Sequence, residues 1–318
     1  MDLIVLSSAK LSNKHRVKLT ETYADVSFIF CENMDESKQY IDTAEVLITY
    51  GEDLTPELIG KAENMKWIMV ISAGVEKMPF EAIQEKGILV TNARGIHKTP
   101  MAEYAISMLL QVYRQGKELM KDEAERNWKR TVRINEISGR TMLIVGAGAI
   151  GGEVARLAKA FNMKVYGISR SGTPREYFDE NYTKSEMESV LSQADFVVSV
   201  LPSTTDTKGF FTYEHFQLMP DHAVFLNMGR GDAVSEEDIL RAVNEQEIAH
   251  AVLDVFETEP LPEDHPFWEA ENVTVTPHLS GKSSKYVTRA LDIFEENLRT
   301  FLNEGGQYIN QIDISRGY

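Results

Sequence analysis

Short runs of apolar residues alternate with helix-like stretches along the first hundred residues. Strands that alternate with helices are typical of a parallel α/β sheet, so this pattern predicts one small doubly wound domain. Two prolines, Pro56 and Pro79, mark the starts of helices over 57–62 and 80–86, because proline is tolerated in the first helical turn. The expected strands cover residues 3–6, 26–30, 46–49, 67–71 and 88–90.

The second part of the chain repeats this alternation after one long helical pattern. Helical spacing of apolar residues from 99 to about 127 predicts a single helix at the junction of two halves. An amphipathic helix over 286–302 follows the second series in sequence, and it can pack back on the first series because chain ends often lie close together. The long helix carries a stripe of Met101, Ala105, Met108, Leu109 and Val112, and the second series of strands covers 142–145, 165–168, 196–201, 224–226, 251–255 and 273–276.

Composition excludes several classes of partner. The length of 318 residues fits about two domains. There are 33 basic and 49 acidic residues, and the formal net charge of −16 disfavours nucleic acid and anionic membranes. No apolar run approaches the length needed to span a membrane, and the first residues lack the basic region of a signal peptide. The single cysteine, Cys31, can form neither an intrachain disulfide nor a thiolate metal cluster, so we expect a cytoplasmic protein without a metal site.

A glycine-rich segment lies between an expected strand and an expected helix. Gly146, Gly148 and Gly151 have the spacing of the dinucleotide fingerprint, with Ala149 and Ile150 in the same turn. Gly146 allows the tight turn, Gly148 allows the backbone to approach a pyrophosphate, and Gly151 allows close packing of helix on strand. The segment therefore predicts a dinucleotide-binding site.

The end of the next strand indicates which dinucleotide is bound. NAD sites carry a carboxylate there, which accepts a hydrogen bond from the ribose 2′-hydroxyl. This chain has Ser169 and Arg170 instead, a hydroxyl and a planar fork that suit a 2′-phosphate. We therefore expect NADP as the cofactor, with NAD as the alternative.

Three polar residues follow apolar strands of the second series, where open α/β sheets place their ligand sites. Arg230 can bind an anion, Glu259 can orient an imidazole ring, and His278 can transfer a proton. Each residue alone is unremarkable in an acidic chain with seven histidines.

The order of the motifs resembles that of the D-isomer-specific 2-hydroxyacid dehydrogenases over nearly the whole chain. The matching segments begin with Ile71-Ser72-Ala73-Gly74-Val75-Glu76, Met101-Ala102-Glu103-Tyr104-Ala105 and the glycine fingerprint; they continue with Leu201-Pro202-Ser203-Thr204, residues 227–231, residues 254–260 and residues 277–281. The resemblance implies a Rossmann cofactor domain, residues 99–282, inserted into a flavodoxin-like substrate domain made of residues 1–98 and 283–318.

The resemblance also implies the roles of the site residues. His278 would be the acid/base, Glu259 its partner and Arg230 the substrate anchor. The backbone around Ala73, Gly74 and Val75 would cradle the substrate carboxylate. Leu201, Pro202, Met228 and Asp254 would contact the cofactor, with Asp254 near the nicotinamide carboxamide.

The implied activity is hydride transfer between a small 2-oxo acid and its D-2-hydroxy acid, as in glyoxylate and hydroxypyruvate reductases. Pro277 stands where formate dehydrogenases of the superfamily carry glutamine, which disfavours formate oxidation. A phosphoglycerate dehydrogenase-type enzyme is a lower-ranked alternative, because the chain ends at Tyr318 without a regulatory domain. A dinucleotide-sensing binding protein of the corepressor kind is the alternative from another class, because fold alone does not separate it from an enzyme.

Family members usually form dimers through the cofactor domain. We therefore expect a homodimer in which the 99–127 helix lies against its mate. The sequence does not determine which residues form the walls of the substrate pocket; Tyr50, His97 and Trp268 are candidates.

Overall fold

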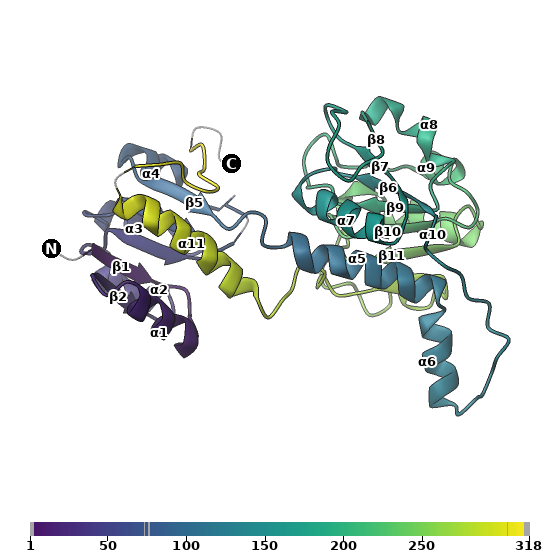
Figure 1. Ribbon diagram of the computed structural model, residues 1–318, viewed down its shortest axis with the longest axis horizontal. Helices are drawn as coiled ribbons and strands as arrows, with labels where there is room; N and C mark the ends of the chain where they lie inside the picture. The colour runs from purple at the N-terminus through teal and green to yellow at the C-terminus, as the bar shows by residue number, and fades with distance from the viewer. Residues whose placement is uncertain (1–2, 73, 76, 304, 315–318) are drawn as a thin grey trace. The chain divides into compact units, whose positions relative to one another are not determined.

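The computed structural model describes residues 3–72, 74–75, 77–303 and 305–314 (Figure 1). The chain divides into two compact units. Unit 1 contains Met1–Ile96 and Ser283–Tyr318, and unit 2 contains His97–Lys282.

Unit 1 is built on a five-stranded parallel sheet in the order β2-β1-β3-β4-β5. Its fully buried middle strands are short, mainly apolar runs, as expected for a sheet covered on both faces. Its strands are β1 (Leu3–Ser7), β2 (Val26–Phe30), β3 (Val46–Thr49), β4 (Trp67–Val70) and β5 (Leu89–Asn92). Its helices are α1 (Asn13–Thr22), α2 (Met34–Ser37), α3 (Pro56–Lys61), α4 (Phe80–Glu85) and α11 (Tyr286–Leu302), with a 3₁₀ turn at Lys38–Tyr40.

The C-terminal helix α11 packs on the N-terminal sheet (Figure 1). Phe294 of α11 stacks on the fully buried indole of Trp67, with ring centroids 5.2 Å apart. Ala290, Leu291 and Leu298 join the same core. The two ends of the chain therefore build one hydrophobic core.

Unit 2 contains a seven-stranded parallel sheet in the order β12-β11-β10-β9-β6-β7-β8. Its strands are β6 (Thr141–Val145), β7 (Lys164–Ile168), β8 (Glu180–Tyr182), β9 (Phe196–Ser199), β10 (Val224–Asn227), β11 (His250–Leu253) and β12 (Val273–Val275). Its helices are α5 (Lys98–Tyr113), α6 (Gly116–Ala124), α7 (Ala149–Ala160), α8 (Glu188–Leu191), α9 (Tyr213–Gln217) and α10 (Glu236–Asn244), with 3₁₀ turns at Lys184–Glu186, Gly231–Ala233 and Pro266–Trp268.

The predicted fold class is confirmed, because both sheets are parallel and their helices alternate with the strands. Every strand expected from the apolar runs is present, and its ends lie within two residues of those predicted. The strand β8 was not predicted. It is a three-residue edge strand with the sequence Glu-Asn-Tyr, so it has no apolar run that would mark it.

The single helix expected over 99–127 is wrong. Gln115 adopts a left-handed conformation with φ of 57°, and the chain forms α5 and α6 on either side of it. At Gly116, which follows, a Cβ would lie 3.3 Å from the Gln111 carbonyl oxygen, so the tight turn between the two helices favours glycine. Among the described residues, no helix is both long and apolar enough to cross a lipid bilayer.

Candidate functional site

The glycine-rich segment forms the turn between β6 and α7. Gly146 has φ of 109°, which favours glycine, and a Cβ on Gly151 would lie 2.3 Å from the Gly146 carbonyl oxygen. Gly148 is the residue before α7, and no side chain caps that helix. A Cβ on Gly148 would meet no atom within 4 Å, so the space beside the helix N-terminus is open. The turn, with Ala149 and Ile150 opening the helix, thus fits the pyrophosphate of a dinucleotide.

Ser169 and Arg170 follow β7 at the same edge of the sheet. The Ser169 hydroxyl oxygen accepts a hydrogen bond from the Gly172 backbone N–H at 3.1 Å. Arg170 is exposed, and its guanidinium has no hydrogen bond or ion pair within the described part of the chain. Its donors are therefore available to a phosphate group.

The loops after β6, β9 and β10 lie against one another. A Cβ on Gly146 would be 3.0 Å from the Val200 carbonyl oxygen, and one on Gly229 would be 2.5 Å from that of Leu201. Leu201 and Met228 are buried there, and Pro202 is exposed. The buried Ser199 hydroxyl has no hydrogen-bond partner in the described structure. These close backbones and this unpaired hydroxyl at the carboxyl edge of the sheet fit a polar ligand such as the dinucleotide.

Asn227, the last residue of β10, forms two hydrogen bonds with the backbone of the loop that carries Arg230. Its side-chain amide donates to the Arg230 carbonyl at 2.9 Å, and its side-chain oxygen accepts from the Gly229 N–H at 3.2 Å. The exposed Arg230 guanidinium donates once to the Gly229 carbonyl at 2.7 Å. Since this contact uses one N–H of five, the fork retains donors for an anion.

His278 and Glu259 form a direct pair. The His278 Nδ1 lies 2.7 Å from the Glu259 Oε2, and the other carboxylate oxygen accepts from the Phe256 backbone N–H at 3.1 Å. The His278 side chain is about half exposed, so its ring is held at one nitrogen and open to solvent. This arrangement suits a proton-transfer group whose orientation is fixed by a carboxylate.

Asp254 organises the loop after β12. Its fully buried carboxylate accepts from the backbone N–H groups of Leu279 and Ser280, each at 2.9 Å. It also accepts from the Thr276 hydroxyl at 2.5 Å. Thr276 was not predicted as a site residue, and neither was its partner Tyr104, which lies 172 positions away and whose hydroxyl lies 2.7 Å from the Thr276 hydroxyl oxygen. Tyr104 belongs to the segment Met101–Ala105 that resembles the family, but nothing in the sequence indicates which group its hydroxyl contacts.

The predicted carboxylate cradle belongs to unit 1, in the turn after β4. The Ser72 hydroxyl donates to the Gly74 carbonyl at 2.9 Å and lies 3.2 Å from that of Tyr50. Gly74 is exposed, and the Val75 side chain is buried in the unit 1 core. Ala73 lies outside the described residues.

An apolar hollow of about 400 Å³ adjoins the His278–Glu259 pair within unit 2. Its walls include Phe256, Leu261, Trp268 and Val275. Trp268, one of the candidate pocket walls, is half exposed there. The surface beside His278 is thus mainly hydrocarbon.

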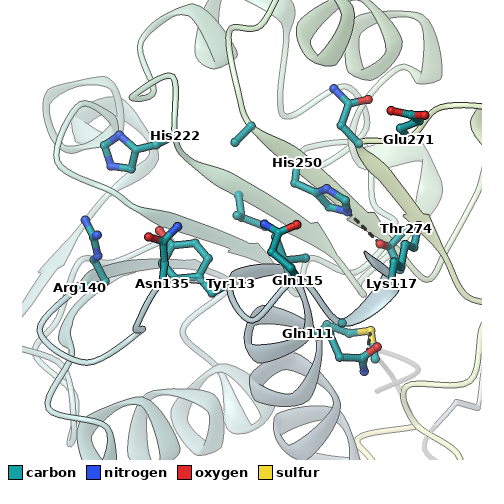
Figure 2. Close-up of a pocket in the computed structure, with 16 residues that line it drawn as sticks. Gln111, Tyr113, Gln115, Lys117, Asn135, Arg140, His222, His250, Glu271 and Thr274 are labelled. Carbon is teal, nitrogen blue, oxygen red and sulfur yellow. Dashed lines mark hydrogen bonds between the residues drawn. The ribbon is translucent and has the colours of Figure 1, made fainter. Parts of the chain in front are cut away.

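A larger hollow of about 630 Å³ lies at the opposite, amino-terminal edge of the unit 2 sheet (Figure 2). Figure 2 shows His222, His250, Lys117 and Arg140 around it. None of the predicted site residues lines it. Because ligands of open α/β sheets bind at the carboxyl ends of the strands, this hollow is not the candidate active site.

His250 in the larger hollow is expected to make the protein sensitive to acid. Burial lowers the pKa of His250 from 6.5 to about 4, and its Nε2 lies 2.8 Å from the Thr274 hydroxyl. Between these two values the unfolded chain binds the extra proton, so stability present above pH 6.5 is lost as the pH falls toward 4. We expect His250→Asn to reduce this acid loss by up to about 3 kcal/mol, measured by urea unfolding at pH 7, 5.5 and 4.5. His15→Asn, at a partly exposed histidine on α1 of unit 1, serves as control; equal acid losses in His250→Asn and the wild type would contradict the prediction.

Comparison with known proteins identifies related chains. The family model "D-isomer specific 2-hydroxyacid dehydrogenase, NAD binding domain" matches residues 106–280. The glyoxylate reductase/hydroxypyruvate reductase of Mus musculus is 32% identical over 231 residues, 71% of this chain and 70% of its own. The hydroxypyruvate reductase of Blautia hydrogenotrophica is 28% identical over 288 residues, 88% of each chain.

Solved structures agree with these sequence relatives. A D-isomer specific 2-hydroxyacid dehydrogenase family protein from Aeromonas salmonicida is 33% identical, with a TM-score of 0.82 over 99% of this chain and 100% of that one. An NADPH-dependent glyoxylate/hydroxypyruvate reductase from Sinorhizobium meliloti, solved with NADP and sulfate, is 25% identical, with a TM-score of 0.76 over 99% and 100%.

Proposed function

Because the chain belongs to the D-isomer-specific 2-hydroxyacid dehydrogenase family, an NAD(P)-dependent oxidoreductase family, we propose that it reduces a small 2-oxo acid to the D-2-hydroxy acid with NADPH, His278 being the acid/base. The observation that carries this proposal is the His278–Glu259 pair, 2.7 Å apart in the unit that bears the glycine-rich turn.

Each residue of the proposed site has a distinct task. The nicotinamide, when bound, supplies the hydride that reduces the carbonyl carbon. Glu259 accepts from the Nδ1–H of His278, which leaves Nε2 to give a proton to the carbonyl oxygen in reduction and to take it back in oxidation. The free donors of Arg230 bind the carboxylate and polarise the carbonyl. In unit 1, the exposed turn at Gly74 is proposed to bind a carboxylate through its backbone N–H.

Turnover of NADPH with a panel of 2-oxo acids tests this function. Glyoxylate and hydroxypyruvate represent small polar substrates, and 4-methyl-2-oxopentanoate and phenylpyruvate are included because the hollow beside His278 is apolar. A purified protein that binds NADPH but reduces no member of the panel would favour the dinucleotide-sensing alternative.

The cofactor preference is expected to depend on Arg170. A hydrogen bond to a charged group contributes about 1.5–3 kcal/mol, so kcat/KM with NADPH should exceed that with NADH by roughly 10–100-fold. Arg170→Asp should narrow or invert this ratio, because it removes the phosphate partner and adds an acceptor for the ribose hydroxyl. Lys14→Asp, the same charge change on α1 of unit 1, should leave the ratio unchanged. Equal use of both cofactors by the wild type would refute the assignment.

We propose a homodimer formed through unit 2. The stripe expected to face a mate is largely covered within one chain, since Ala105 and Leu109 are fully buried in the unit 2 core. The apolar surface available to a mate lies instead on α6 and the segment after it, which extends from the sheet of unit 2 (Figure 1). Leu119, Met120, Trp128 and Ile134 are exposed there, Trp128 at 91%.

Light scattering tests the dimer. We expect a particle near 72 kDa, twice the chain mass of 36.0 kDa, at micromolar concentration. Trp128→Asp should shift the mass toward 36 kDa, whereas Val17→Asp on α1 of unit 1 should not. A wild-type particle of one chain mass would refute the proposal.

A cytoplasmic location is part of the same proposal. It is supported by the single cysteine, Cys31, which is a buried free thiol and suits a reducing compartment.

A further inference from the structure

The loop that carries His278 has an unfavourable backbone conformation. We call residues 277–281 the His278 loop. His278 has φ of 48°, in the left-handed region that residues with a Cβ rarely adopt. Its side chain is about half exposed, so packing of the ring alone does not hold this conformation. Other contacts must therefore fix the loop.

Asp254 provides those contacts. The His278 N–H donates to the Asp254 backbone carbonyl at 2.9 Å, and the next two N–H groups, of Leu279 and Ser280, donate to the Asp254 carboxylate. Three consecutive N–H groups of the loop thus converge on one residue, which is fully buried. The loop conformation depends on the orientation of that carboxylate.

Thr276 and Tyr104 orient the carboxylate in turn. The Thr276 hydroxyl has one proton, which it donates to Asp254 Oδ1 at 2.5 Å, so its oxygen can only accept from the Tyr104 hydroxyl at 2.7 Å. Tyr104 lies on α5 and is largely buried. Burial raises the pKa of Tyr104, so the phenol remains a donor over the working pH range. The hydrogen bonds run in one direction, from α5 to the His278 loop.

We infer that Tyr104 and Thr276 are positioning residues for the proposed reaction, which hold the acid/base His278 in place through the buried carboxylate of Asp254. Neither side chain bonds to His278. The inference rests on the proposed role of His278.

Four variants test this series of hydrogen bonds from Tyr104 through Thr276 to Asp254, which we call the relay. Their kinetics are measured with NADPH and the best oxo acid of the panel. Thr276→Val keeps the β-branched shape but removes the hydroxyl, and we expect kcat to fall about 10- to 100-fold with KM within about threefold. Thr276→Ser restores the hydroxyl and should keep kcat within about threefold of the wild type. Tyr104→Phe leaves the Thr276–Asp254 bond in place, so a smaller loss of about 3- to 10-fold is expected. Tyr113→Phe is the matched control on α5, since that tyrosine is also largely buried and its hydroxyl has no hydrogen bond in the described structure.

Hydrogen exchange of the loop gives a readout that is independent of turnover. Thr276→Val should speed amide exchange across the His278 loop at least tenfold, and Thr276→Ser should not. If the wild type reduces no oxo acid, the proposed function fails, but the exchange rates still decide whether the relay holds the loop. Should Thr276→Val not fold, Tyr104→Phe against Tyr113→Phe decides the same question. Wild-type exchange and kcat in Thr276→Val, or equal losses in the two tyrosine variants, would overturn the inference.

Discussion

Replacing His278 by alanine is expected to lower turnover by about 10²–10⁴-fold, the size of a lost general acid. Cofactor binding should stay near normal, because the glycine-rich turn and the Ser169–Arg170 segment belong to other loops of unit 2. Stopped-flow reduction of the best oxo acid gives the rate of the chemical step, and quenching of protein fluorescence by NADPH gives the dissociation constant.

A second histidine–carboxylate pair in the same unit supplies the control. The Nε2 of His222 lies 2.9 Å from Asp195 Oδ1, at the edge of the sheet opposite to the candidate site, and the His222 side chain is about half exposed, like that of His278. His222→Ala should leave turnover unchanged. Near-wild-type turnover in His278→Ala would mean that the proton comes from another group.

Truncation of Arg230 to alanine should raise KM for the oxo acid and lower kcat together. The side chain is proposed both to bind the carboxylate and to polarise the carbonyl, and loss of one such donor at a reacting carbonyl costs about 10²–10³ in rate. Steady-state kinetics at saturating NADPH separates the two constants.

Arg230→Lys keeps the charge but loses the planar fork, so its kcat/KM should lie between those of the alanine variant and the wild type. Asn227 bonds only to backbone atoms of residues 229 and 230, so both substitutions keep these contacts, although Arg230→Ala loses the guanidinium contact with the Gly229 carbonyl. A rise in KM with unchanged kcat would show that Arg230 binds substrate without acting on the carbonyl.

The strands were predictable because most of them are buried on both faces and appear as short aliphatic runs. Strand β8 has one flanking strand only and polar residues, so no such run marks it. The end of α5 was not predictable for a different reason. Glutamine is a good helix former, yet Gln115 adopts a left-handed conformation at the turn between the helices, where Gly116 approaches the Gln111 carbonyl.

The candidate site likewise contains features that the sequence predicts and features that it does not. The glycine turn is a local structure, so its residues and spacing identify it in the sequence. The pairing of Glu259 with His278 was predicted from the family resemblance alone. The two side chains lie in loops after different strands, so no local pattern shows that they meet. The contact between Tyr104 and Thr276 joins α5 to the end of β12, and no local pattern encodes a distance between such remote positions.

The discontinuity of unit 1 has a consequence for how the chain folds during synthesis. The segment of residues 97 to 282 is continuous and can close its own core as soon as it leaves the ribosome. The N-terminal sheet cannot, because one of its faces, including Trp67, is covered by Phe294 and Leu298 of α11, which are made last. At about 5–20 residues per second the wait is roughly 10–40 s, during which an apolar sheet face stays uncovered. The N-terminal segment is therefore the part of the nascent chain most in need of a chaperone, although it is the first to be made.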